Sequence, residues 1–140
     1  MNETAMITVK DMVKKFGTFV ANDHLSFQVY KGEIFGFLGA NGAGKTTAMR
    51  ILCGLSKPTS GEIRVAGMSV YEHAEDIKKR IGYMSQKFSL YQDLTVSENM
   101  QLYGGIYGMP DHDIRVRREQ LLTRLGLKDQ HNTLISNLPL

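Results

Sequence analysis

One stretch, IFGFLGANGAGKTTAMRILC, constrains the fold of this chain more than any other. It spans residues 34–53 and passes from an apolar run through a glycine-rich bend into a helix-compatible segment. Glycine at positions 39, 42 and 44 lets the backbone adopt positive φ angles and bring its amides close to an anion. A helix beginning near Lys45 adds unpaired amides and the positive end of its dipole. The stretch therefore predicts a strand, a phosphate-binding loop and a helix.

Two side-chain types at the end of this bend suit phosphate chemistry. Lys45 supplies a mobile ammonium for terminal phosphates, and the Thr46 hydroxyl is placed to ligate the magnesium that accompanies them. A tight turn that is merely glycine-rich is the alternative, but the position between a strand and a helix favours nucleotide binding. The predicted phosphate-loop residues are Gly39, Asn41, Gly42, Ala43, Gly44, Lys45, Thr46 and Thr47.

Composition narrows the class of protein. The chain has 140 residues, 42% hydrophobic and 22% charged, which suits one globular domain but is short for a complete P-loop ATPase. Its net charge of +3 is mild, and the basic runs at 78–80 and 115–118 fit solvated helix faces, which disfavours a nucleic-acid surface. No apolar run approaches the roughly eighteen residues of a membrane span. We therefore expect any membrane connection to run through a partner.

Cysteine and histidine usage argues against two other site classes. Cys53 is the single cysteine, so no internal disulfide can form, and a reducing compartment is the simplest expectation. The four histidines lie far apart without ligand spacing, which disfavours a metal site built from them.

Alternating apolar residues predict a small antiparallel sheet. Residues 5–16 alternate loosely and the LSFQV segment alternates strictly, so two strands should flank a turn near Gly17 and Asn22-Asp23. Residues 61–66 predict a further strand, with Ile63 and Val65 on one face. The apolar segment 81–85 predicts another.

Helical signals dominate the last third. Residues 73–80 predict a short helix, because acidic residues come early and basic residues late. Thr95 and Glu98 form a capping box before an apolar repeat, and Asp111 can cap a second helix that stops at Gly126. The expected apolar stripes are Val96, Met100, Tyr103 and Tyr107 in the first helix and Ile114, Leu121, Leu122 and Leu125 in the second.

In order, the segments KKFGTFVAND, LSFQV, KGEIFGFLGANGAGKTT, KPTSGEIRVAG, IGYMSQ and LTVSENM resemble the nucleotide-binding subunit of ABC transporters, particularly bacterial exporters of the ABC-2 type. The resemblance covers essentially the whole chain. It implies an α/β fold, a P-loop NTPase core of ABC type with an antiparallel β subdomain and a helical subdomain, incomplete at the C-terminus. The β subdomain would comprise residues 1–33 and 58–71, the nucleotide core 34–57 and 72–93, and the helical subdomain 94–140.

The resemblance also implies roles for particular residues. Phe16 matches the aromatic on which the family stacks adenine, with core packing as the alternative role. Gln86 matches the glutamine that reaches magnesium and the attacking water, with a plain surface residue as the alternative. Magnesium would thus meet Thr46 and Gln86. Residues 87–94 would face the membrane subunit, and the cofactors would be ATP and Mg2+.

The sequence departs from the family pattern after this point. No four apolar residues are followed by Asp-Glu, and the nearest candidate, GLKDQ at 126–130, has too few apolar residues. If Leu138 aligns with the first residue of the family signature LSGGQ, Pro139 replaces its serine and removes both a hydroxyl and an amide donor. We therefore expect an amino-terminal portion of an ABC ATPase that binds nucleotide without sustained hydrolysis. Without the strand beside the phosphate-loop strand, we also expect marginal stability.

Three functional hypotheses follow. The first is the energy-coupling component of a transporter, with export as the expected direction for the parent protein, working with a membrane-spanning subunit and a second ATP-binding subunit at the cytoplasmic face of the inner membrane. The second is a soluble ABC ATPase acting on ribosomes or nucleic acid. The third, an unrelated P-loop kinase or GTPase, has no support from Phe16 or Gln86.

Overall fold

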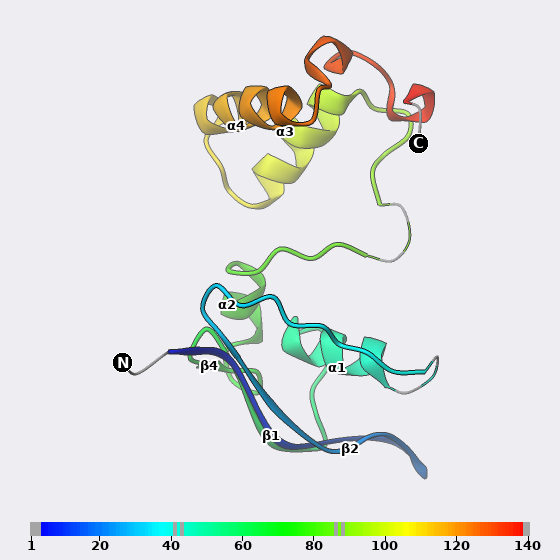
Figure 1. The fold of residues 1–140 in the computed structure, drawn as a ribbon, viewed down its shortest axis with the longest axis vertical. Coiled ribbons are helices and arrows are strands. Elements are labelled where there is room, and N and C mark those ends of the chain that lie inside the picture. The colour runs from blue at the N-terminus through cyan, green and yellow to red at the C-terminus, as the bar shows by residue number, and fades with distance from the viewer. Residues whose placement is uncertain (1–3, 41, 43, 86, 88, 139–140) are drawn as a thin grey trace. The chain divides into compact units, whose positions relative to one another are not determined.

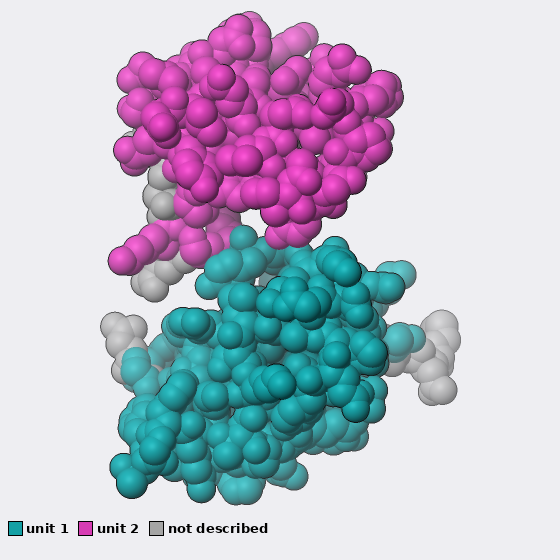
Figure 2. Space-filling view, turned by 180° about the vertical axis from the view of Figure 1, so that it is seen from behind, with its two compact units in different colours: residues 1–83 teal, residues 84–140 magenta. Residues whose placement is uncertain are grey.

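The computed structural model describes residues 4–40, 42, 44–85, 87 and 89–138. The chain divides into two compact units, Met1–Tyr83 and Met84–Leu140, which Figure 2 colours separately. Each unit has its own elements and its own apolar cluster, so each is described by itself.

A four-stranded antiparallel sheet forms one layer of the first unit (Figure 1). Strands β1 (Ala5–Phe16) and β2 (Phe19–Tyr30) form a long hairpin, and β3 (Ser60–Val65) and β4 (Met68–Ser69) extend it in the order β2-β1-β3-β4. The antiparallel sheet expected from the alternating pattern is therefore present.

The predicted turn at Asn22-Asp23 is wrong. The hairpin turns at Gly17 and Thr18, where Phe16 pairs with Phe19, and Asn22 lies inside β2. The register shifts along this hairpin, and Asp11 and His24 have positive φ angles of 50° and 46°. Such irregularities let a strand continue through residues that are typical of turns.

Helices α1 (Lys45–Leu52) and α2 (Ala74–Lys78) complete the first unit. Helix α1 lies against β2 and β3, and α2 corresponds to the short helix expected at 73–80. Full burial of a large aliphatic side chain contributes roughly 1.5–3 kcal/mol, so this core is the main stabilising term of the unit. Its buried residues are Val9, Met12, Ala48, Ile51, Leu52, Ile63, Val65, Val70 and Ile77.

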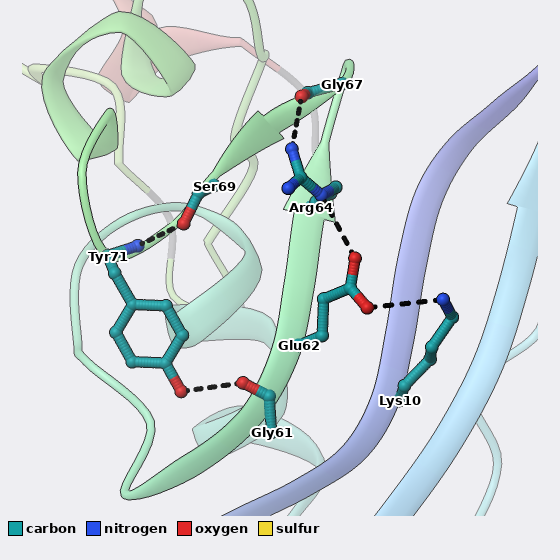
Figure 3. Close-up of polar contacts among 7 residues, drawn as sticks. All are labelled: Lys10, Gly61, Glu62, Arg64, Gly67, Ser69 and Tyr71. Carbon is teal, nitrogen blue, oxygen red and sulfur yellow. Dashed lines mark hydrogen bonds and ion pairs between the residues drawn. The ribbon is translucent and has the colours of Figure 1, made fainter.

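The exposed face of β1 and β3 carries a small polar network (Figure 3). Lys10 Nζ donates to Glu62 Oε2 at 3.2 Å, across the β1–β3 register, and Arg64 Nε donates to Glu62 Oε1 at 3.1 Å. Hydrogen bonds from Arg64 and then Lys10 lower the pKa of the Glu62 carboxyl. Because the network is solvent-exposed, it orders side chains on β1 and β3 more than it stabilises the fold.

Two predicted strands are wrong. Residues 34–38 and 81–85 have no strand assignment, and in the first of these segments Ile34 is 99% and Leu38 94% exposed. An apolar run becomes a parallel strand only when neighbours satisfy its amides and carbonyls. Within the described residues, neither segment finds such a neighbour, because the sheet consists of β1 to β4.

The second unit is built on helices α3 (Val96–Ile106) and α4 (Asp111–Arg124), followed by the 3-10 helices η1 (Lys128–Gln130) and η2 (Ile135–Asn137). The capping box is confirmed: Glu98 N donates to Thr95 Oγ1 at 3.2 Å, and Thr95 N donates to Glu98 Oε2 at 2.8 Å. These Thr95 bonds lower the pKa of the Glu98 carboxyl, so acidification through that pKa weakens the cap.

Helix α4 differs in detail from its expected form. Its cap is Pro110, and Asp111 is its first residue; Gly126 follows its end with φ 70°. Ile114 and Leu122 are buried, whereas Leu121 is 45% and Leu125 58% exposed. Two residues of the expected apolar stripe, Ile114 and Leu122, are therefore buried, and the other two are not. The apolar cluster of the unit comprises Val96, Leu122 and Ile135 with Met100, Leu127 and Leu138 around them.

Packing explains the glycine at only one position of the Gly104-Gly105 pair in α3. A Cβ atom added to Gly104 would lie 2.6 Å from Cγ1 of the buried Ile114, whereas one added to Gly105 would meet nothing within 4 Å. Close approach of α3 to α4 thus requires glycine at 104 alone.

Alanine substitutions at these adjacent positions should therefore change the stability of the second unit in opposite directions. Gly105→Ala should stabilise the second unit by about 0.5–1 kcal/mol through helix propensity. Gly104→Ala gains the same propensity but overpacks Ile114, and the net result should be destabilisation by about 1–2 kcal/mol. Urea unfolding followed by far-UV circular dichroism measures both. Equal stabilisation by the two variants would contradict the close approach.

Candidate nucleotide-binding site

The start of α1 is open to an anion. Its cap residue Gly44 has φ 77°, and within the described residues it provides no side-chain hydrogen bond to the first turn. The first turn carries no acidic residue either. Helix starts leave amide groups unpaired and concentrate the positive end of the dipole, so the site offers donors to a negatively charged group.

The buried residues of α1 hold the start of the helix in place. Ala48, Ile51 and Leu52 are buried in the core of the first unit, and Ala48 N donates to Gly44 O at 2.9 Å. The preceding segment is held by aromatic packing. Phe27 and Phe35 stack with ring centroids 5.1 Å apart, and Phe37 lies 5.5 Å from Phe27.

The Lys45 ammonium lies over the loop that precedes it. Its Nζ donates to Gly39 O, and to Ala40 O at 2.6 Å. Gly42 and Gly44 have φ angles of 83° and 77°, the conformations expected from the sequence. The cation and the unpaired helix amides therefore converge on the same bend. Two predicted loop positions, Asn41 and Ala43, lie outside the described residues.

The two threonines lie in the first turn of α1. Thr46 is exposed and Thr47 is half-buried, so the Thr46 hydroxyl is accessible to a bound group. Among the residues that the structure describes, no three His, Cys, Asp or Glu side chains cluster as a metal site. A divalent cation here would draw its oxygens from phosphate groups, water and the Thr46 hydroxyl, which is the donor set that Mg2+ prefers.

Phe16 lies on the surface at the end of β1. The residue is 54% exposed, and Lys14 Nζ lies 4.9 Å from its ring centroid. Core packing therefore does not account for this aromatic residue, and its surface position suits stacking on a planar ring. Its hairpin partner Phe19 is 61% exposed.

Gln86, the predicted magnesium and water ligand, lies outside the described residues. In the second unit, Ser85 Oγ donates to Lys87 O at 2.6 Å, and Tyr103 Oη donates to Ser89 O at 2.6 Å. The segment that follows Gln86 is thus attached to α3.

Sequence reasoning missed Asn99, which organises this segment. The residue is 2% exposed; its Oδ1 accepts from Tyr91 N at 2.8 Å, and its Nδ2 donates to Tyr91 O at 2.9 Å and Thr95 O at 3.1 Å. A signal was present, because Asn99 falls on the apolar stripe between Val96 and Met100. A polar residue on such a stripe indicates a buried amide with a structural task.

Sequence reasoning also missed Asn22, which touches the predicted phosphate loop. Its side chain is buried, and Nδ2 donates to Gly44 O at 3.1 Å. Its turn-like sequence context concealed this role. The GLKDQ segment, by contrast, forms η1 with exposed Lys128 and Asp129, and is not a strand.

Within the described ranges, no helix has both the length and the apolar character needed to cross a bilayer. The sequence profile of the family described as "ABC transporter" matches residues 22–139. That match contains the phosphate loop, α1 and nearly all of the second unit.

Individual relatives agree with the profile. The chain is 43% identical over 135 residues to the "Probable multidrug ABC transporter ATP-binding protein YbhF" of Escherichia coli (strain K12), aligning 96% of this chain with 23% of that protein. It is 39% identical over 122 residues to the "Nod factor export ATP-binding protein I" of Ralstonia nicotianae, aligning 87% of this chain with 38% of that protein. The chain thus spans well under half the length of either relative.

A solved structure confirms the expected fold class. The "Structure of ATP binding subunit of ABC transporter" superposes with a TM-score of 0.82 at 25% identity, covering 96% of this chain and 56% of that one. The α/β fold of ABC type, with an antiparallel sheet and a helical part, is therefore present. By profile, relatives and fold, this chain belongs to the ABC transporter family.

Proposed function

We propose that this chain binds MgATP and forms part of the energy-coupling subunit of an exporter. The observation that carries the proposal is the convergence at the start of α1, where the Lys45 ammonium lies on the Gly39 and Ala40 carbonyls beside unpaired helix amides. A triphosphate matches this arrangement because it is a compact polyanion with oxygens on several sides.

Each part of the nucleotide has a candidate partner. The phosphates would meet the amides of residues 39–47 and the Lys45 ammonium, which exchanges its carbonyl contacts for phosphate oxygens. Magnesium, when bound, neutralises phosphate charge, and Thr46 and Gln86 are the side chains proposed to hold it. The adenine ring would stack on Phe16, whose surface exposure supports this role.

Binding without sustained hydrolysis is proposed for the 140-residue chain. Hydrolysis requires a group that orients water and donors that meet the developing charge. Gln86 is the only proposed water-contacting residue, and Asp129 of the GLKDQ segment is exposed in η1 rather than following an apolar strand. We infer that the parent protein is an ATPase and that this chain supplies the nucleotide-cradling part.

The name of one reported relative supports export, and the name of the other supports transport. One is named for multidrug transport and the other for Nod factor export. We propose a membrane-spanning partner and a second ATP-binding subunit, with the assembly at the cytoplasmic face of the inner membrane. The segment 87–94, bonded to α3 through Asn99 and Tyr103, is the proposed contact with the membrane subunit. Co-purification of the parent protein with ribosomes rather than membranes would favour a soluble ABC ATPase instead.

Replacing Lys45 by alanine should remove MgATP binding while the chain stays folded. The ammonium is the only cationic side chain whose donors are fixed on the loop carbonyls among the described contacts, so its loss should weaken binding at least about tenfold, or about 1.4 kcal/mol. Isothermal titration calorimetry measures the affinity. Lys31→Ala, at an exposed turn of the same unit, is the matched control. Unchanged affinity in Lys45→Ala would refute the proposed role.

Phe16→Ala and Phe19→Ala form a second matched pair, because both residues are exposed and they are partners in the hairpin register. Phe16→Ala should weaken ATP about threefold to tenfold and leave pyrophosphate unaffected, since pyrophosphate has no ring to stack. Phe19→Ala should change neither affinity. Competition against a fluorescent adenine nucleotide resolves the two ligands. Equal loss of ATP and pyrophosphate in Phe16→Ala would remove the stacking role.

A further inference from the structure

Residues Ala21 and Asn22 of β2 pack directly against Gly44, at the end of the predicted phosphate loop. A Cβ atom added to Gly44 would overlap the Ala21 carbonyl oxygen and lie 2.7 Å from Nδ2 of Asn22. Asn22 and Gly44 are 22 residues apart in the sequence, yet they are in direct contact at the cap of α1. Only glycine permits this approach at position 44, both for lack of space and because its φ is 77°.

Two donors fix the Gly44 carbonyl. Asn22 Nδ2 donates to it at 3.1 Å from β2, and Ala48 N donates to it at 2.9 Å from inside α1. A trans peptide is planar, with its N–H pointing opposite to its C=O. Fixing the Gly44 oxygen therefore also fixes the direction of the Lys45 amide, which is the first amide of α1 and points away from both donors.

Core packing alone does not explain asparagine at this position. Asn22 is 7% exposed, and within the described part of the chain its Oδ1 has no hydrogen-bond partner. An unsatisfied buried acceptor is unfavourable, and an aliphatic residue would fill the same space without one. The side chain thus uses its donor on Gly44 while its acceptor remains unsatisfied.

We propose that Asn22 is a positioning residue of the nucleotide site: it orients the Gly44–Lys45 peptide so that the first amide of α1 faces the phosphate. This inference rests on the proposed function, because it assigns a supporting residue to the same site. It also joins the two ends of that site, since β2 belongs to the hairpin that carries Phe16.

The charged groups around Asn22 determine how a substitution should behave. Lys14 lies opposite it in the β1–β2 register, with Nζ donating to Lys57 O at 2.7 Å. Asp23 and His24 follow it in β2, with His24 Nε2 3.8 Å from Asp23 Oδ1. Lys45 is the first residue of α1, next to Gly44. A carboxylate at position 22 would face the Gly44 carbonyl, acceptor against acceptor, and add negative charge beside the phosphate.

Asn22→Asp converts this contact into a pH-dependent one. Below the pKa of the new carboxyl, its O–H can donate to Gly44 O and restore the bond. Above that pKa, the donor is lost and the carboxylate repels phosphate. Asn22→Leu has similar volume and no donor at any pH. Asn22→Leu thus separates positioning from packing, because it removes the donor without adding charge, and a packing role predicts no loss of affinity in that variant.

The experiment measures pyrophosphate and MgADP affinities of the 140-residue chain across pH, each divided by the wild-type affinity at the same pH to remove titration of the ligand. For Asn22→Asp we expect a loss of at least about tenfold at high pH that shrinks to less than about threefold at low pH. For Asn22→Leu we expect a pH-independent loss of about fivefold to tenfold. The amide resonance of Lys45 should shift in Asn22→Asp with the same midpoint.

The outcomes are distinguishable. Wild-type affinity in both folded variants, in a chain where Lys45→Ala abolishes binding, overturns the positioning role and leaves the proposed function intact. If Asn22→Leu does not fold, the pH profile of the near-isosteric Asn22→Asp decides: a flat ratio refutes the inference. Absence of pyrophosphate and ADP binding in the wild type overturns the proposed function, and this inference with it.

Discussion

The site depends on one electrostatic arrangement: unpaired amides at the start of a helix that is buried on one face. Ala48, Ile51 and Leu52 anchor α1 in the core, so its first turn cannot move away when an anion approaches. Lys45 then adds a full charge where the helix supplies only partial ones. Because the donors are held in place by the fold, little binding energy would be lost in ordering them around an anion.

The same constraint explains why the first unit is built as it is. A short helix of eight residues is not stable alone, so its orientation has to come from the sheet that it packs on. The long β1–β2 hairpin provides that sheet and also the close backbone approach at Gly44. The apolar segment before the loop is held differently, by the Phe27, Phe35 and Phe37 rings rather than by strand pairing.

Local signals in the sequence predicted most elements and the glycine conformations of the bend before α1. The capping box at Thr95, the positive φ of Gly42 and Gly44, and the burial of Ile63 and Val65 all follow from short-range rules. The wrong predictions, which are the strands at 34–38 and 81–85 and the turn at Asn22-Asp23, depend on contacts distant in sequence. Whether residues 34–38 form a strand depends on a neighbouring strand, and whether Asn22-Asp23 turns depends on the hairpin register, neither of which an apolar pattern contains.

Both buried asparagines show why polar residues were the hardest to interpret. Asn99 bonds the backbone of the segment before α3, and Asn22 bonds the carbonyl at the start of α1. In each unit, a carboxamide on a regular element supplies a donor to the backbone of an irregular segment or of a helix cap. Since a carboxamide is short and has both donors and an acceptor, it can replace a backbone neighbour within the packed interior. Irregular loops that must hold a fixed shape therefore depend on amides from regular elements, and in this chain the loop proposed to meet phosphate follows that rule.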